Sequence, residues 1–260
     1  MGAAARFVHL HLHTDYSLLD GACDIVELVE AAARQQMPAV AVTDHGNLFA
    51  AANFYHEATT RGVKPIIGCE VYVAKGSRHD RGGETPDAMG TGRSNHLLLL
   101  CEDTEGYRNL VRLVSAGFLE GFYYKPRIDY ELLARHSRGL IALSACLRGE
   151  VAEHLCEDRY EQAREAAYRL RDIFGKNNFF LEVQDQGLEI EKRVNREMVR
   201  LSKETGIPLV ATNDCHYLTR EDARAQEVLL CIQTGKTLSD PNRMKFATDE
   251  FYFKTAEEMA

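Results

Sequence analysis

The feature of this sequence that most constrains its fold is a regular alternation of short apolar segments with amphipathic ones. Seven apolar runs have the length and composition of buried strands. They span residues 7–13, 39–43, 64–73, 96–101, 140–144, 179–183 and 209–212. Helical patterns lie among them at residues 25–34, 48–61, 106–116, 159–174, 189–205 and 220–232. This alternation predicts an α/β fold with parallel strands, either a (βα) barrel or a doubly wound sheet.

Length and composition narrow the class of protein. A chain of 260 residues, 45% of them hydrophobic, can bury the core of one α/β barrel or of two smaller domains. No apolar run approaches the length of a membrane span, and the first residues lack the apolar stretch of a signal peptide. Seven cysteines without a Cys-x-x-Cys pair are typical of a reducing compartment. We therefore expect a cytoplasmic protein with no membrane partner.

The net charge of −8 bears on nucleic-acid binding. A protein that binds nucleic acid by itself is usually basic, because phosphate contacts supply most of its affinity. If this chain handles nucleic acid, metal ions or a larger assembly must offset its charge.

Two segments outside the strand–helix pattern carry further expectations. Residues 75–95 are polar and glycine-rich, which predicts a long mobile loop over one face. Residues 255–258 have the spacing of a helix capping box, and the sequence stops two residues later. We interpret this ending as a helix cut short in the amino-terminal piece of a longer protein, in preference to a frayed natural end.

The first predicted strand carries a candidate metal-binding pair. Side chains at i and i+2 of a strand point to the same face, so His11 and His13 direct two imidazoles to one spot, as a metal ion requires. Asp20 lies on the following turn and can fold back towards them. Asp214 and His216 repeat the same spacing after the last predicted strand.

Other metal-ligating residue types lie at or near the strand ends, the rim where α/β barrels build their sites. They are His45, Glu70, His96 and Cys146, with Glu182 as an additional candidate. Each has an ordinary explanation by itself: a turn histidine, an outward-facing acid, a core histidine or a small buried thiol. Asp214 by itself is explained equally well as a helix cap. Their recurrence on successive strands favours a metal site.

Nine potential ligands exceed the needs of one ion. We therefore expect two or three divalent ions bridged by carboxylates, with Zn, Mn or Fe favoured by mixed imidazole and carboxylate ligands. Close metal pairs hydrolyse phosphate esters by generating hydroxide at neutral pH and by stabilising the attacking and leaving oxygens.

These motifs resemble the polymerase and histidinol phosphatase (PHP) domain family. The segments 7–21, 41–48, 209–217, 230–236 and 251–259 are most similar to its replicative-polymerase branch, the amino-terminal PHP domains of bacterial DNA polymerase III alpha subunits. The resemblance covers nearly the whole chain. It implies a distorted seven-stranded (βα) TIM-like barrel, a single PHP domain over residues 1–260, and polymerase domains that follow it.

The resemblance also implies three metal positions. One ion would be surrounded by His11, His13, Glu70 and Asp214. A second would be held by Glu70, His96 and Cys146, with Glu70 bridging, and a third by Asp20, His45 and His216. Phosphatase relatives carry histidine where this chain has Asp20 and Cys146, and the polymerase relatives look more like this chain. None of the nine ligands is lost, which implies a working 3′→5′ exonuclease that proofreads DNA 3′ ends.

Roles for single residues follow from this interpretation. Asp214, Glu70, His13 and Asp44 are expected to carry the reaction, with Asp44 orienting His45. Arg148 is a candidate phosphate clamp, although a surface arginine at the start of a helix explains it equally well. The remaining histidines are assigned to surface or packing positions: His9, His56, His79, His136 and His154.

Partners and rival functions complete the expectations. The DNA 3′ end and the polymerase domains in cis are the expected partners, with the sliding clamp and other replisome subunits reached through the longer chain. One rival is a small-molecule phosphatase of the histidinol-phosphatase type. The other is a metal-bearing scaffold domain without activity.

Overall fold

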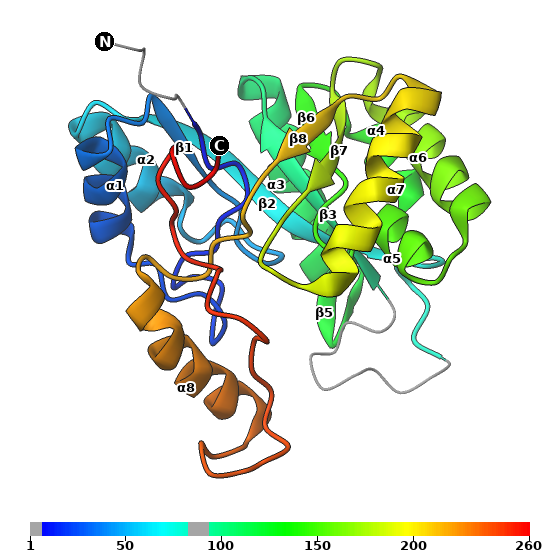
Figure 1. The fold of residues 1–260 in the computed structure, drawn as a ribbon. Coiled ribbons are helices and arrows are strands. Elements are labelled where there is room, and N and C mark those ends of the chain that lie inside the picture. The colour runs from blue at the N-terminus through cyan, green and yellow to red at the C-terminus, as the bar shows by residue number, and fades with distance from the viewer. Residues whose placement is uncertain (1–6, 83–93) are drawn as a thin grey trace. The chain divides into compact units, whose positions relative to one another are not determined.

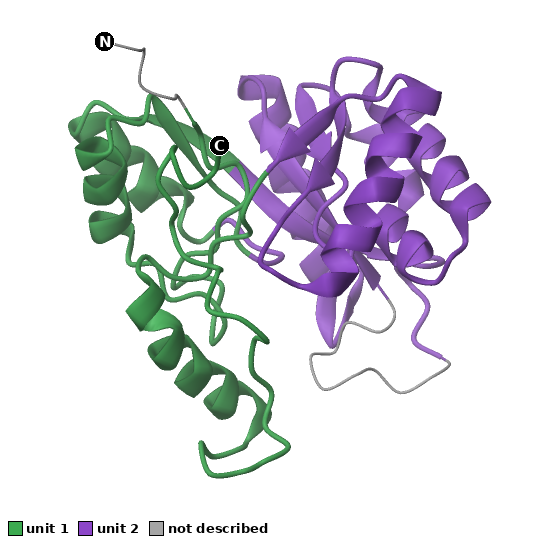
Figure 2. Cartoon of the chain, viewed as in Figure 1, with its two compact units in different colours: residues 1–44, 49–67, 212–260 green, residues 45–48, 68–211 purple. Residues whose placement is uncertain are grey.

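The computed structural model describes residues 7–82 and 94–260, and the chain divides into two compact units (Figure 2). Unit 1 contains residues 1–44, 49–67 and 212–260, and unit 2 contains residues 45–48 and 68–211. Strand β2 (Lys64–Ala74) belongs to both, because its first four residues lie in unit 1 and the rest in unit 2. Within the described ranges, no helix is both long and apolar enough to cross a membrane.

Unit 1 packs two helices and a short parallel strand pair around its own core, and a further helix, α8, extends from them (Figure 1). Its elements are α1 (Ile25–Arg34), β1 (Ala39–Val42), α2 (Ala51–Thr60), the start of β2, the 3-10 turn η1 (Arg220–Asp222) and α8 (Ala223–Thr234). In the register of β1 on β2, Ala39 lies opposite Lys64 and Val42 opposite Ile67. The Asp24 side chain accepts hydrogen bonds from the first turn of α1, as its capping position predicts.

Unit 2 contains most of the sheet and covers it with helices. After β2 come β3 (Ser94–Cys101), α3 (Thr104–Leu119), β4 (Phe122–Tyr123), β5 (Lys125–Ile128), α4 (Tyr130–Arg135), β6 (Leu140–Leu143), α5 (Glu150–Cys156), α6 (Tyr160–Phe174), β7 (Phe179–Val183), α7 (Glu189–Thr205) and β8 (Leu209–Ala211). The strand order is β4-β5-β2-β3-β6-β7-β8. Parallel pairs join β2 to β5, β6 to β7 and β7 to β8.

The expectation of an all-parallel sheet is wrong at β3, which runs antiparallel to both β2 and β6. Parallel neighbours need a long crossover, usually a helix, and the polar segment between β2 and β3 has no helical pattern. The loop prediction for residues 75–95 falls largely outside the described residues, since positions 83–93 are among those not described.

Other elements differ from the prediction in smaller ways. Residues 7–13 form no regular strand, although isolated bridges join Leu12 to Cys215 and Thr14 to Cys23. The short elements β4, β5, α4 and α5 were not predicted, because each is too brief to show a periodic pattern. The remaining predicted strands and helices are present, with α1 and α7 at the predicted bounds.

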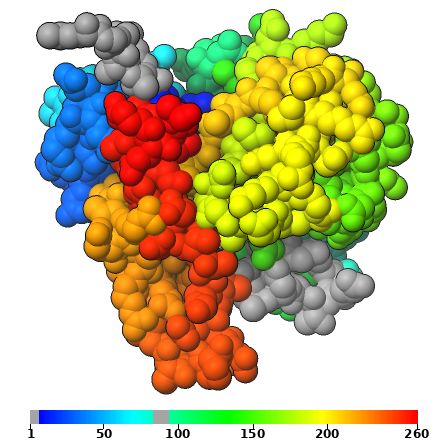
Figure 3. Space-filling model, viewed as in Figure 1, coloured from blue at the N-terminus to red at the C-terminus, as the bar shows by residue number. Residues whose placement is uncertain are grey.

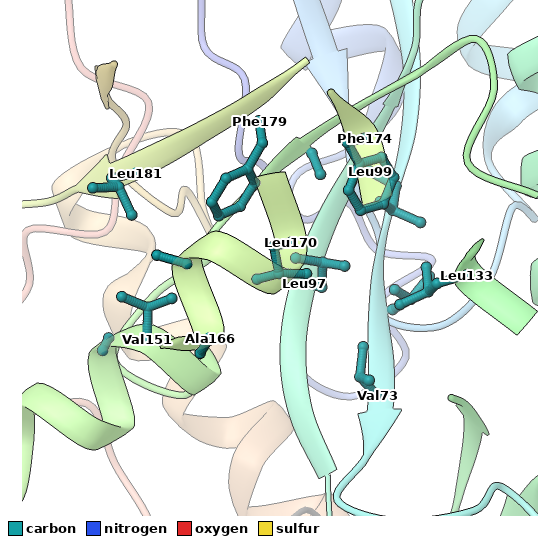
Figure 4. Close-up of a cluster of buried hydrophobic side chains, with 14 of the residues drawn as sticks. Val73, Leu97, Leu99, Leu133, Val151, Ala166, Leu170, Phe174, Phe179 and Leu181 are labelled. Carbon is teal, nitrogen blue, oxygen red and sulfur yellow. The ribbon is translucent and has the colours of Figure 1, made fainter. Parts of the chain in front are cut away.

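Packing in the core of unit 2 determines which side chains of β2 and β3 remain available for a site on the other face. Alternate residues of the two strands, including Val73, Leu97 and Leu99, pack into this core with helix residues such as Leu170 (Figure 4). Because successive side chains of a strand point to opposite faces, Glu70 and His96 lie on the other face of the sheet.

Candidate metal centre

In unit 1 the two i, i+2 motifs lie side by side, although about 200 residues separate them. The backbone N–H of His13 donates to the carbonyl of Cys215 at 2.8 Å, and the N–H of Cys215 donates to the carbonyl of His11 at 3.1 Å. Leu12 and Cys215, which face each other at the centre of this pairing, are fully buried in the core of unit 1. Their neighbours on either side therefore turn to the opposite face.

The Asp214 carboxylate lies among three imidazoles. Its Oδ1 is 3.1 Å from His11 Nε2, 3.2 Å from His13 Nε2 and 3.6 Å from His216 Nδ1. This oxygen is buried, and all three ring nitrogens lie within 4 Å of it. Imidazole nitrogens and a carboxylate oxygen gathered at one buried point form the donor set that binds a divalent cation.

The backbone of Asp214 is also unusual. Its φ of +48° lies in the left-handed region, which residues other than glycine seldom adopt. Such strained residues cluster at functional sites, where the surrounding structure holds them in place.

The histidines determine the charge of Asp214. Burial alone raises the pKa of this carboxyl, but the nearby imidazoles of His11, His216 and His13 outweigh it and hold the pKa below its ordinary value. Asp214 is therefore anionic at neutral pH, the form that binds a metal ion.

Hydrogen bonds select the ring tautomers of two histidines. The Ser17 hydroxyl donates to Asp44 Oδ1 at 2.7 Å, so at its 3.0 Å contact with His13 Nδ1 the nitrogen must be the donor. His216 Nδ1 likewise lies 2.8 Å from the backbone carbonyl of Asp214, which can only accept. In the neutral form of both rings Nε2 therefore carries the lone pair, the form in which histidine ligates a metal.

Asp44 acts on this half of the site. Its carboxylate accepts from the Thr14 backbone N–H at 2.7 Å, from the Thr14 hydroxyl at 2.8 Å and from Ser17. Asp44 is thus connected to His13 by two hydrogen bonds that share the Ser17 hydroxyl. That Asp44 also orients His45 stays a prediction.

Asp20 lies on a tight turn. Its Oδ1 lies 3.9 Å from His216 Nε2 and accepts from Gln226 Nε2 at 3.3 Å. The adjacent Gly21 allows the turn to close, because a Cβ at this position would lie 2.1 Å from the carbonyl oxygen of Thr14. The turn therefore folds back, and it brings Asp20 beside His216 of the second motif.

Unit 2 holds a second cluster, centred on Glu70. This carboxylate is buried, with His45 Nδ1 2.7 Å from Oε2 and His96 Nδ1 2.9 Å from Oε1. Cys146 Sγ lies 4.0 Å from Oε1. The outward-facing alternative for Glu70 is wrong, and so is the alternative in which His96 is an isolated core histidine.

The sheet register explains this second cluster. Glu70 pairs with Leu98, and His96 lies two residues from Leu98 on the same face, so the two side chains are diagonal neighbours. A bridge between His45 and Glu70 holds the histidine on the other side, where the Gly46 N–H donates to the Glu70 carbonyl at 2.8 Å. Gly46 has a φ of +63° and lies against Tyr72, which leaves no room for a side chain.

The remaining predicted residues lie around these clusters. Cys146 follows Ala145, whose φ of +64° is again left-handed, and it shares a small cavity of about 10 Å³ with Glu182. Arg148 is exposed before the N-terminus of α5, and its carbonyl accepts from the His96 N–H at 3.0 Å. His9 is buried away from the ligands, with Nε2 2.8 Å from the Lys254 carbonyl.

Three contributors to the site were missed in the sequence. Ser17 follows His13 by four residues, Tyr72 follows Glu70 by two, and Gln226 lies on α8. The Tyr72 ring lies 5.2 Å from that of His96. The strand spacing signals Tyr72, but Ser17 and Gln226 have no local signal because they act through hydrogen bonds formed by the folded chain.

The donor sets fit divalent metal ions. One ligand atom each from His45, Glu70 and His96 lies within 4.8 Å of the others, close enough to share an ion. Unit 1 offers imidazoles and carboxylates, and unit 2 adds one thiol. Such mixed sets suit zinc, manganese or iron.

Comparison with known families agrees with this chemistry. The family model described as "PHP domain" matches residues 9–186. The chain therefore belongs to the PHP domain family. The fold agrees, because a Bifidobacterium adolescentis protein classed as a metal-dependent phosphoesterase superposes with a TM-score of 0.51 at 14% identity, covering 98% of this chain and 96% of that one. This superposition confirms the predicted fold class, a distorted α/β barrel of the PHP type.

The similar curated proteins are DNA polymerase III alpha subunits. That of Treponema pallidum is 51% identical over 258 residues, which is 99% of this chain and 22% of the relative. That of Thermus aquaticus is 50% identical over 262 residues, 100% of this chain and 21% of the relative. The chain thus spans about a fifth of the length of these relatives.

Proposed function

We propose that this chain is a metal-dependent phosphoesterase that removes nucleotides from the 3′ end of DNA. The observation that carries the proposal is the buried Asp214 oxygen, which lies 3.1 Å from His11 Nε2 and 3.2 Å from His13 Nε2. Membership of the PHP family supports the phosphoesterase chemistry. The similarity to DNA polymerase III alpha subunits supports DNA as the substrate.

The two clusters supply the metal ligands in this proposal. Those of unit 1 are His11, His13, Asp20, Asp214 and His216, and those of unit 2 are His45, Glu70, His96 and Cys146. Bound divalent ions would provide Lewis-acid activation of the phosphate ester. The chain itself keeps Asp214 anionic and presents Nε2 of His13 and His216 as lone-pair donors.

The wider role rests on the same proposal. A chain with a net charge of −8 needs other sources of DNA affinity, and polymerase domains in cis would provide them. We propose that the chain proofreads as the amino-terminal PHP domain of a longer cytoplasmic replicative polymerase, which also contacts the sliding clamp and other replisome subunits. Arg148, exposed beyond Cys146, is the proposed phosphate contact.

The test is nucleotide release from a 3′-labelled single-stranded oligonucleotide by the purified chain with added Mn²⁺ or Zn²⁺. A phosphate monoester such as histidinol phosphate serves as the competing substrate. We expect metal-dependent release of mononucleotides from the oligonucleotide, and its loss in the Asp214→Ala variant.

Each other outcome contradicts part of the proposal. Faster turnover of the monoester than of the oligonucleotide would identify a small-molecule phosphatase. A chain that binds metal but hydrolyses neither substrate, alone or within the longer polymerase, would be a scaffold domain.

A further inference from the structure

A cavity of about 470 Å³ lies within unit 1, walled by α8 and by the segment that follows it, residues 243–249. Figure 3 shows these two segments together on the surface, in orange and red-orange. The wall includes Tyr217, Arg224, Gln226, Arg243, Lys245 and Phe246. A volume of this size is in the range of sites that enclose small organic ligands.

The charge of the wall favours an anion. Arg224 and Arg243 form ion pairs with the same carboxylate, because they contact different oxygens of Glu227 at 2.7 and 2.6 Å. Asp249 is paired with Arg220 at 2.8 Å. Lys245 is exposed and has no acidic partner within the described residues. Three cations against two acids leave one excess positive charge on the wall of a strongly acidic chain.

The cavity adjoins the metal ligands of unit 1. The Phe246 ring lies 4.9 Å from the ring of His216, and Gln226 donates to Asp20. Phe246 is half-buried and forms part of the wall, where it offers an aromatic surface. An aromatic ring and a cation beside the proposed phosphoesterase centre match the base and the phosphate of a nucleotide.

We infer that this cavity is the subsite for the nucleotide to be removed, a role that rests on the proposed function. The base stacks on Phe246, and Lys245 contacts a phosphate. Stacking on an aromatic ring accepts every base, as a nuclease without sequence preference requires.

The test is equilibrium binding of deoxyadenosine monophosphate to the metal-free 260-residue chain, with inorganic phosphate as a second probe. The variants are Lys245→Ala and Phe246→Leu, with Lys203→Ala as a control for the loss of one exposed lysine elsewhere. We expect the mononucleotide to bind more tightly than phosphate. Loss of stacking or of the lysine should weaken binding about tenfold, and the control should not change it.

The inference is overturned if the mononucleotide does not bind at millimolar concentration, binds no better than phosphate, or binds equally well to the Lys245 and Phe246 variants. The oligonucleotide assay tests the proposed function separately from the nucleotide site. Binding that follows these variants without any nucleotide release would contradict the nuclease but not the nucleotide site. Release with an unchanged KM in both variants would contradict the site but not the nuclease.

Discussion

At the scale of residues, metal binding depends on which ring nitrogen of His13 and of His216 carries the proton. Because Ser17 gives its proton to Asp44, the serine oxygen accepts from His13 Nδ1 and leaves Nε2 directed at Asp214. The same arrangement recurs at His216, where a backbone carbonyl takes the Nδ1 proton. Hydrogen bonds that fix the tautomer of a ligand strengthen metal binding although they do not touch the metal.

We predict that Ser17→Ala lowers the affinity for Mn²⁺ or Zn²⁺ by about 10- to 100-fold, because His13 loses the contact that orients its ring. Competition with a chromophoric chelator measures this affinity. The control is Ser202→Ala, which removes a hydroxyl bonded to the Ile207 carbonyl at 2.6 Å in unit 2. Equal affinities for the Ser17 variant and the wild type would show that the hydrogen bond between Ser17 and His13 does not support metal binding.

Asp214→Asn tests the carboxylate with almost no change of shape. We predict that the variant loses at least about tenfold in metal affinity, because an amide offers no negative charge to the ion. Metal content after gel filtration, determined by mass spectrometry, reports the loss. Retention of the full wild-type metal content would exclude Asp214 as a ligand.

Some of these residues could be predicted from the sequence, and others could not. The i, i+2 spacing of His11 with His13 and of Asp214 with His216 was enough to propose each pair. That the pairs meet depends on backbone hydrogen bonds across about 200 residues, which no local pattern reveals. Ser17 and Gln226 contribute through such long-range contacts as well.

At the scale of elements, strand direction and tight turns place the ligands. The sequence predicted β2 and β3 from their apolar runs, but only the antiparallel register brings His96 diagonal to Glu70. Strand direction depends on the connection, and the segment between these strands carries no pattern from which to derive it. The position of Glu70 could therefore be proposed from the sequence, but its neighbours could not.

The turn that carries Asp20 tolerates no side chain at Gly21. We predict that Gly21→Ala lowers the free energy of unfolding by about 3 kcal/mol or more, since its Cβ would overlap the Thr14 carbonyl and the turn would have to open. Urea denaturation followed by circular dichroism measures the change. Gly82→Ala is the control, because a Cβ there meets no atom of the described residues within 4 Å. A Gly21 variant as stable as the control would contradict the tight turn.

An ion pair in unit 2 makes stability depend on pH. Arg78 Nη1 contacts both oxygens of Asp129 at 3.1 and 3.0 Å, and Asp129 also caps α4 by accepting from the Leu132 N–H at 3.0 Å. Burial alone raises the pKa of Asp129, but hydrogen bonds from the Arg78 and Leu132 backbones and the Arg78 guanidinium hold it below its ordinary value.

A carboxyl with a lowered pKa stabilises the fold above the pKa it has when unfolded, about 3.9, and this contribution is lost as the pH falls through the folded pKa. We predict that the wild type loses more stability than Asp129→Asn between pH 5 and pH 3. Denaturant unfolding at several pH values measures both proteins. Parallel curves for the two proteins would show that Asp129 has an ordinary pKa.

At the scale of the whole molecule, ligands come from both compact units and from both ends of the chain. The α/β class follows from the alternation of strand and helix patterns, and the family follows from motifs spread over the chain. The division into two units was not predictable, because unit 1 is assembled from three separate segments and no boundary in composition marks them.

The measurement that tests the central claim most directly is the recovery of activity in the chelated chain. The protein is stripped with a chelator, dialysed, and titrated with Mn²⁺ or Zn²⁺ while nucleotide release from a 3′-labelled single strand is followed. We predict no release from the stripped chain, recovery as metal is added, and no recovery in Asp214→Asn. Release by the stripped chain, or full recovery in the variant, would contradict a phosphoesterase built on these ligands.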